Sequence, residues 1–274
     1  MFSKVTPDQL NDFRLIYHQT TGYSNPIIET VLYQDRGSNG IYYFGDLIDG
    51  NYFIFHRSGF CHMNFNLFEN YIDDLILGEI DSFLQKNEDI PKFLMFYNTP
   101  IKFLGYLKKA NKQYFKIRKR RRYQINEVSF LKMDEKNYSI PQNHKIVNIQ
   151  DCPIQDLNLF NLALDKKFYN SYDDFLENSF GFVLYNEQSI PVSISYLICK
   201  VGRNSECDLL TLPEYRKHGY GYICITNYVK ESILRKIEVG WDCFINNDTN
   251  KWVQEYGYTK IIREYDFVTF LNKE

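Results

Sequence analysis

The sequence lacks several features that would assign a functional class at once. No stretch approaches the roughly 18 apolar residues of a membrane-spanning helix. The opening residues, MFSKVTPDQL, show neither the basic stretch nor the apolar run of a signal peptide. A net charge of −2 provides no basic field that would attract nucleic acid. We therefore expect a cytoplasmic protein with no membrane partner and no nucleic-acid partner.

The cysteines and histidines lack the spacing of a metal site. The chain has six Cys and five His, and no two Cys form a CxxC pair. Several Cys lie within apolar, strand-like runs, which is typical of buried free thiols in a reducing compartment. We expect no metal.

What the chain does contain is enough apolar material for a sizeable core. Hydrophobic residues make up 44% of the 274 positions and charged residues 24%, which are the proportions of a globular protein. Aromatic residues reach 17%, which predicts extensive aromatic packing. The length allows one large domain or two ordinary ones.

Apolar periodicity and turn signals predict an α+β, or mixed α/β, fold. In the first half, the expected strands are 41–44, 52–56, 93–97 and a basic strand 114–128, and the expected helices are 66–84 and about 100–110. In the second half, the expected strands are 181–185, 192–199, 205–212, 239–244 and 262–270, and the expected helices are 219–236 and 249–256.

A polar segment at 134–143, which contains Pro141, suggests a domain boundary near residue 130. We expect an N-terminal α/β domain at 1–130 and a second domain at 131–274. The same order of features occurs in both halves of the sequence. In the first half, Phe96-Tyr97-Asn98 is followed by a helix and a basic strand; in the second half, Phe244-Ile245-Asn246 is followed by a helix and a strand. This faint repeat suggests that the first domain is a degenerate copy of the second.

The segment CDLLTLPEYRKHGYGY, at 207–222, predicts a phosphate-binding loop. A strand ends near Leu212, Arg216 and Lys217 follow, and Gly219 and Gly221 open a helix. Glycines let the backbone approach an anion, and the first N–H groups of a helix point toward it. The pattern is neither GxxxxGK[ST] nor GxGxxG, so a P-loop nucleotidase and a Rossmann cofactor are both disfavoured. An ordinary glycine-containing helix start is the alternative reading.

These residues resemble the GNAT superfamily of N-acetyltransferases. Arg216-x-x-Gly219-x-Gly221 matches that superfamily's (Q/R)xxGx(G/A) signature. Further along the chain, Val239–Cys243 resembles the family's fifth strand. Asn246-x-x-Thr249 resembles its Asn-x-x-Ser helix start, and Tyr256-Gly257-Tyr258 resembles its Leu-Gly-Phe helix ending. Trp241-Asp242-Cys243 and the segment 168–182 are similar to a two-domain subfamily that includes zwittermicin-resistance-type acetyltransferases. The resemblance covers about residues 140–270.

The resemblance implies a mixed, largely antiparallel sheet that splays between its fourth and fifth strands, and acetyl-CoA as the co-substrate. Pantetheine would pair with the exposed edge of the fourth strand, and the pyrophosphate would meet the loop. The residues implied to bind the cofactor are Leu210, Thr211, Leu212, Arg216, Lys217, His218, Gly219, Tyr220, Gly221, Tyr222, Asn246 and Thr249. Asn246 and Thr249 are also candidates for a helix N-cap.

Acetyl transfer to an amine needs a base, and two carboxylates lie on the fourth strand. Glu206 and Asp208 are two residues apart, so they share one face of the strand. We favour Glu206, ahead of Asp208 and Asp242, although each could simply bind an Arg or backbone group. The resemblance implies a Tyr as the general acid four residues before the Gly of the helix ending, but that position is Val253 here, and the nearby Tyr256 occupies the usual Leu position. Either another Tyr substitutes, or the thiolate leaves without help.

The predicted function is an acetyl-CoA-dependent N-acetyltransferase acting on a small-molecule primary amine. The alternatives are a protein or peptide N-acetyltransferase and a catalytically silent CoA-binding module. Whether the chain forms a homodimer stays open. The basic run at 116–122 favours a solvated or salt-bridged strand over a nucleic-acid contact.

Overall fold

The computed structural model divides into two compact units, described separately below. The structure describes residues 2–22, 25–34, 40–65, 74–109, 115–133, 139–162, 168–247, 250 and 259–271. The first unit contains residues 1–120 and 264–274, and the second contains residues 121–263. The sequence had suggested a boundary near residue 130, with everything beyond it in one domain. Here residues 121–130 belong to the second unit, and the last residues of the chain belong to the first.

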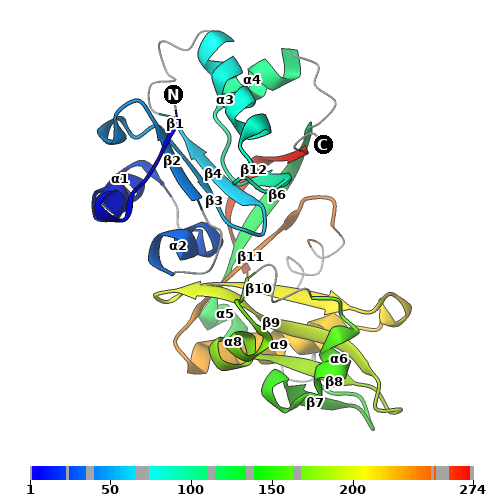
Figure 1. Cartoon of the computed structure of the whole chain (residues 1–274). Helices are drawn as coiled ribbons and strands as arrows, with labels where there is room; N and C mark the ends of the chain where they lie inside the picture. Colours follow the sequence, from blue (N-terminus) through cyan, green and yellow to red (C-terminus); the bar gives the residue numbers. More distant parts are fainter. Residues whose placement is uncertain are drawn as a thin grey trace. The chain divides into compact units, whose positions relative to one another are not determined.

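The first unit is a mixed sheet with helices on both faces (Figure 1). Its strands, in spatial order, are β1 (Phe2–Lys4), β2 (Gly40–Phe44), β3 (Tyr52–Phe55), β4 (Phe60–Asn64), β5 (Phe93–Phe96) and the part of β12 (Thr259–Leu271) that begins at Glu264. Its helices are α1 (Leu10–Thr20), α2 (Pro26–Tyr33), α3 (Asp74–Lys86) and α4 (Ile101–Lys109). Neighbouring strands are antiparallel except for β4 and β5, which are parallel and joined through α3.

The core of the first unit is aromatic, as the composition predicts. Phe53, Phe55 and Phe96 of the sheet pack with Leu77 of α3 and Phe103 of α4 in one buried cluster. On the opposite face, α2 packs against β3 and β4. Asn25 caps α2, because its side chain accepts hydrogen bonds from the N–H groups of Ile27 and Ile28.

The second unit repeats this topology. Its strands, in spatial order, are the C-terminal part of β6 (Phe115–Ile125), β11 (Glu238–Phe244), β10 (Asn204–Thr211), β9 (Pro191–Val201), β8 (Gly181–Tyr185) and β7 (Lys145–Asn148). Its helices are α5 (Glu127–Leu131), α6 (Ile154–Asn158), α8 (Tyr172–Asn178) and α9 (Tyr220–Leu234). Strands β7 to β10 are antiparallel neighbours, and β10 is parallel to β11, to which α9 connects it.

The first unit therefore contains one strand segment that lies outside the continuous stretch making up the rest of it, whereas the second unit is continuous from residue 121 to residue 263. β12, at the end of the chain, pairs with β5 through Val268–Leu271 and completes the first unit. The last residues of β6 lie beside β11 in the second unit. The predicted mixed, largely antiparallel fold is confirmed, and the similar order of strands in both units agrees with the faint repeat in the sequence.

Several predicted elements differ at their ends. The basic strand expected to reach Val128 stops at Ile125, because Asn126 accepts a hydrogen bond from the N–H of Ser129 and caps α5. The helix expected at 66–84 is described only as α3, and residues 66–73 lie outside the described residues. The helix expected at 249–256 also lies outside them, apart from Asn250. All six cysteines are free and buried, as expected.

Candidate functional site

The predicted phosphate loop connects β10 to α9 in the second unit. It begins with the short 3-10 helix Pro213–Tyr215 and ends where α9, 15 residues long, starts at Tyr220. Gly219 is the N-cap and has φ +79, a left-handed conformation that glycine adopts without strain. Apart from its two chain neighbours, no described residue has a side-chain atom within 4 Å of the position that a Cβ at Gly219 would occupy. The glycine therefore shapes the loop while leaving its surface open.

The backbone N–H groups of this loop are the main feature of the site. Those at the two ends are used within the loop: Arg216 N–H donates to Pro213 O (3.4 Å) and Tyr222 N–H donates to Gly219 O (3.0 Å). Between them, the N–H groups from Lys217 to Gly221 have no acceptor among the described residues. Unsatisfied N–H groups at a helix N-terminus form an anion-binding site, and the helix dipole adds to it.

The cationic side chains of the loop are exposed and differ in their contacts. The Nε of Arg216 donates to the carbonyl of Thr211 (3.2 Å), which ties the loop to the end of β10. Lys217 adopts a positive φ of 67°. Gly221 lies against β10, since a Cβ there would be 3.1 Å from Thr211 Oγ1. Gly221 therefore permits the close packing of α9 on the sheet.

Strands β10 and β11 pair over only part of their length. Their register runs from Asn204 and Glu238 to Glu206 and Gly240, although β10 continues to Thr211 and β11 to Phe244. We call the region beyond Glu206 and Gly240 the β10–β11 gap. A register shift between β9 and β10 occurs at Glu206 and Cys207, where the gap begins. The gap occupies the position implied for the splayed strands.

Alternation along β10 decides which backbone groups face the gap. The N–H of Leu212 donates to Val192 O on β9 (3.0 Å). In an antiparallel pair, alternate residues turn both backbone groups to the same side, so Leu210 faces β9 as well. Leu209 and Thr211 therefore face the gap, where the N–H of Leu209 donates to Oδ1 of Asp208 (2.8 Å) and the carbonyl of Thr211 accepts from Nε of Arg216. Of the three residues implied to pair with pantetheine, only Thr211 has this orientation, and the sequence had not singled out Leu209.

Glu206, the favoured base, forms a buried ion pair. Its Oε2 lies 2.8 Å from Nη1 of Arg122 on β6, and both side chains are almost fully buried. Arg122 reaches it by passing over β11 at Gly240, where a Cβ would lie 2.5 Å from Nη2 of Arg122. Glu206 thus binds an Arg group, the alternative that the sequence left open, and its role as a base stays a prediction.

Asp208 lies two residues closer to the open end of the gap. It is half-buried, and its Oδ2 accepts a hydrogen bond from the hydroxyl of Tyr196 on β9 (3.4 Å). Burial, together with the Asp208 carboxylate, raises the pKa of Tyr196 well above its usual range. Tyr196 therefore stays a neutral donor to Asp208. Cys207, on the opposite face of β10, packs in the core beneath α9, and burial raises the pKa of its thiol as well.

The far end of β11 is held by a buried asparagine that the sequence did not single out. The side chain of Asn250 donates to the carbonyls of Phe244 and Ile245 and accepts from the hydroxyl of Tyr123 on β6. Asn246 is exposed, and the structure gives it no contact that tests its predicted role. Thr249, Val253 and Tyr256 lie outside the described residues.

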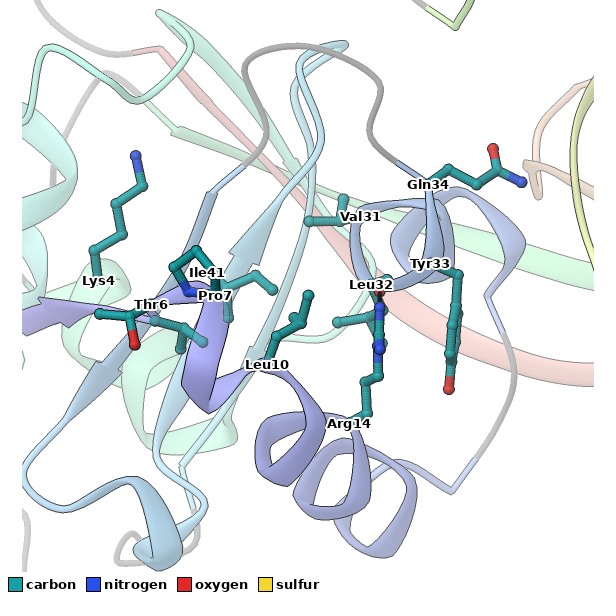
Figure 2. Close-up of a pocket in the computed structure, with 11 residues that line it drawn as sticks. Lys4, Thr6, Pro7, Leu10, Arg14, Val31, Leu32, Tyr33, Gln34 and Ile41 are labelled. Atoms are coloured by element: carbon teal, nitrogen blue, oxygen red, sulfur yellow. Dashed lines mark hydrogen bonds between the residues drawn. The ribbon is translucent and has the colours of Figure 1, made fainter.

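A cavity of about 750 Å³ lies in the first unit, remote in sequence from the loop (Figure 2). Its wall combines apolar side chains such as Leu10 and Ile41 with the cations Lys4 and Arg14. The Arg14 guanidinium donates to the carbonyl of Leu32 (2.8 Å from Nε) and lies over the Tyr33 ring. None of the predicted site residues lines this cavity.

No helix among the described residues is long and apolar enough to cross a membrane. No group of three or more His, Cys, Asp or Glu side chains in the described ranges could hold a metal ion.

Comparison with known proteins gives matches to one family. The model of a family described as GNAT acetyltransferase matches residues 60–267. The uncharacterized N-acetyltransferase YdfB of Bacillus subtilis (strain 168) is 28% identical over 134 residues, which are 48% of this chain and 50% of that protein. The match thus spans about half of the curated relative's length.

Two solved structures show the same fold over nearly the whole chain. A GCN5-related N-acetyltransferase-like protein from Streptococcus suis 89/1591 has a TM-score of 0.69 and 14% identity, covering 95% of this chain and 98% of that one. A tandem GNAT protein from the clavulanic acid biosynthesis pathway has a TM-score of 0.63 and 8% identity, covering 100% and 99%. At these identities the structural likeness concerns the fold.

Proposed function

We propose a reaction for this chain from its family, since it belongs to the GNAT acetyltransferase family. The proposed reaction is transfer of the acetyl group of acetyl-CoA to a primary amine of a small molecule. The observation that carries the proposal is the run of backbone N–H groups from Lys217 to Gly221 without a described acceptor, directly beside the β10–β11 gap. The loop supplies an anion site, and the gap supplies a strand edge of β10 that β11 does not pair with. Acetyl-CoA has a pyrophosphate for the first and amide groups for the second.

The loop residues fit a pyrophosphate in charge and in geometry. The open surface at Gly219 admits the ligand, the free N–H groups donate to phosphate oxygens, and Lys217 adds an exposed cation. The Nε of Arg216 binds the Thr211 carbonyl and fixes the loop, so Nη1 and Nη2 are the atoms proposed to bind the ligand. The carbonyl of Leu209 and the N–H of Thr211 are the proposed partners of the pantetheine amides along β10, because the N–H of Leu209 and the carbonyl of Thr211 already bind Asp208 and Arg216. Asn246 remains a proposed contact beyond β11.

The thioester supplies an activated acetyl group, and the residues around the gap have to handle the proton of the amine. Asp208 is the proposed base, because it lies beyond the last paired residues and is oriented by the neutral Tyr196 hydroxyl. Glu206 is the weaker candidate, because the Arg122 guanidinium already occupies its Oε2. We propose that the Arg122–Glu206 pair fixes the closed end of the gap.

Two assays on the intact protein test the proposal. Acetyl-CoA and CoA should raise the melting temperature, while pantetheine, which has no phosphates, should raise it less. Release of free CoA thiol is then followed over a panel of small amines, with N-terminal peptides as a second panel. Thiol release with small amines is the expected result. Release with peptides alone would indicate a peptide N-acetyltransferase, and binding without release in either panel would indicate a silent CoA-binding module.

A further inference from the structure

At the start of α9, one tyrosine lies between two histidines. Nε2 of His144, from the segment before β7, is 3.1 Å from the hydroxyl oxygen of Tyr220, and the ring centroids are 5.3 Å apart. The His218 ring stacks on Tyr220 with centroids 5.5 Å apart and an interplanar angle of 19°. Tyr220 also packs on a core cluster that includes Leu184 and Ile223. The tyrosine side chain is therefore fixed in place beside the anion loop.

The contacts of the two histidines determine which ring nitrogen carries hydrogen. Nδ1 of His144 is 3.1 Å from the carbonyl oxygen of Gln142, and Nδ1 of His218 is 2.8 Å from that of Arg216. A carbonyl oxygen can only accept, so each Nδ1 bears the hydrogen of the neutral ring. In both residues Nε2 is then the atom that gains a proton when the ring becomes a cation.

Protonation at these two Nε2 atoms would change the donors offered by the loop. Beside neutral His144, the hydroxyl of Tyr220 donates to Nε2 and its hydrogen is occupied. Protonated His144 donates from Nε2 to the Tyr220 oxygen instead, which frees the hydroxyl hydrogen for another acceptor. His218 is an exposed residue of the same loop, so its protonated Nε2 adds one N–H donor to the loop. Both changes add donors and positive charge where the phosphates are proposed to bind.

We propose that His144 and His218, acting with Tyr220, are phosphate-recognition residues, and that binding of a phosphate-bearing ligand is coupled to proton uptake by these imidazoles. This inference rests on the proposed function and extends it to how the phosphates are held. The pyrophosphate, which carries one negative charge on each of its two phosphates, gives the two cationic rings a compensating charge, and charge-assisted hydrogen bonds stabilise that state. The charged side chains nearest in the sequence to the two rings are the cations Lys145, Arg216 and Lys217 and the carboxylate Glu214.

Calorimetric titration of the full chain with CoA tests the coupling. At pH 7, titrations in two buffers of different ionisation enthalpy give the number of protons taken up on binding. The wild type should take up protons, and its Kd for CoA should fall between pH 8 and pH 6 by about tenfold for each histidine, the size of one charge-assisted hydrogen bond. The double variant His144→Gln, His218→Gln should lose this component and keep only the proton exchange of CoA itself.

Two controls keep the test decisive. Pantetheine, which lacks phosphates, should bind the wild type without proton uptake. Tyr220→Phe keeps the ring and removes only the hydroxyl, so it should lose the part of the pH dependence that depends on His144. Equal proton uptake by wild type and double variant would overturn the inference while leaving CoA binding intact. Failure of the wild type to bind CoA would overturn the proposed function itself.

Discussion

Gly240 should be one of the least replaceable residues of the second unit, because its missing side chain makes room for a charge. In Gly240→Ala, the new Cβ would lie 2.5 Å from Nη2 and 3.2 Å from Cζ of Arg122, and 3.0 Å from the carbonyl oxygen of Ser205. The Ser205 carbonyl belongs to the sheet and moves little. The Arg122 guanidinium therefore has to move from its position over β11, which disrupts its ion pair with the buried Glu206 carboxylate.

The size of this effect follows from the burial of the pair. Breaking a buried ion pair by removing one partner costs about 3–5 kcal/mol, because an uncompensated charge remains in the interior. We expect Gly240→Ala to lower the free energy of unfolding of the second unit by that amount. Both tryptophans of the chain, Trp241 and Trp252, belong to this unit, so their fluorescence during urea denaturation reports on it.

A mutant cycle separates loss of the ion pair from ordinary crowding. In the background Arg122→Ala, Glu206→Gln, the pair is already absent, and a Cβ at position 240 meets only the Ser205 carbonyl at close range. There Gly240→Ala should cost about 1 kcal/mol or less, giving a coupling energy of about 2–4 kcal/mol. An equal cost in both backgrounds would refute the argument that Gly240 exists to let Arg122 pass.

Three further predictions concern the loop, the base and the strand end. Gly219→Ala should destabilise the protein by about 1–2 kcal/mol because of the left-handed backbone, and Gly219→Asn by less; equal melting temperatures for both variants and the wild type would contradict this. Asp208→Asn should lower kcat/KM by about 10²–10⁴-fold and remove the acidic limb of its pH profile, whereas Glu206→Gln should keep the profile; an unchanged profile for Asp208→Asn would exclude it as the base. Tyr123→Phe, which removes the hydroxyl that donates to Asn250, should raise KM for acetyl-CoA more than it lowers kcat, and the reverse pattern would argue against a role in holding β11.

The sequence was most informative where structure is local. Strand 181–185 was predicted with its observed ends, and the loop and helix around Gly219 lie within one residue of their predicted start. Both depend on alternation, periodicity or a glycine within a short window. Helices α1 and α2 were not predicted. In α1, the apolar residues Phe13 and Tyr17 are four positions apart and both are buried, and this helical spacing could have indicated the helix.

The site was less predictable, because its side chains come together from distant parts of the chain. Arg122 and Glu206 are 84 residues apart, and the sequence showed Arg122 only as part of a basic run. The orientation of Leu209 depends on the register of β10 against β9, and a shift of one residue reverses it. His144 and Tyr220 are 76 residues apart. No periodicity within either segment indicates such pairings.

The placement of β12 has a consequence for the order in which the protein can be made. β5 emerges from the ribosome early, but its neighbour β12 consists of residues 259–271. The sheet of the first unit therefore cannot be completed until the whole second unit has been synthesised, although domains are usually thought to fold from the N-terminus onward. During that interval the edge of β5 carries unpaired backbone groups, and such an edge is prone to pair with another chain. A nascent chain of this protein should thus depend on protection during synthesis for longer than a chain whose first unit closes on itself.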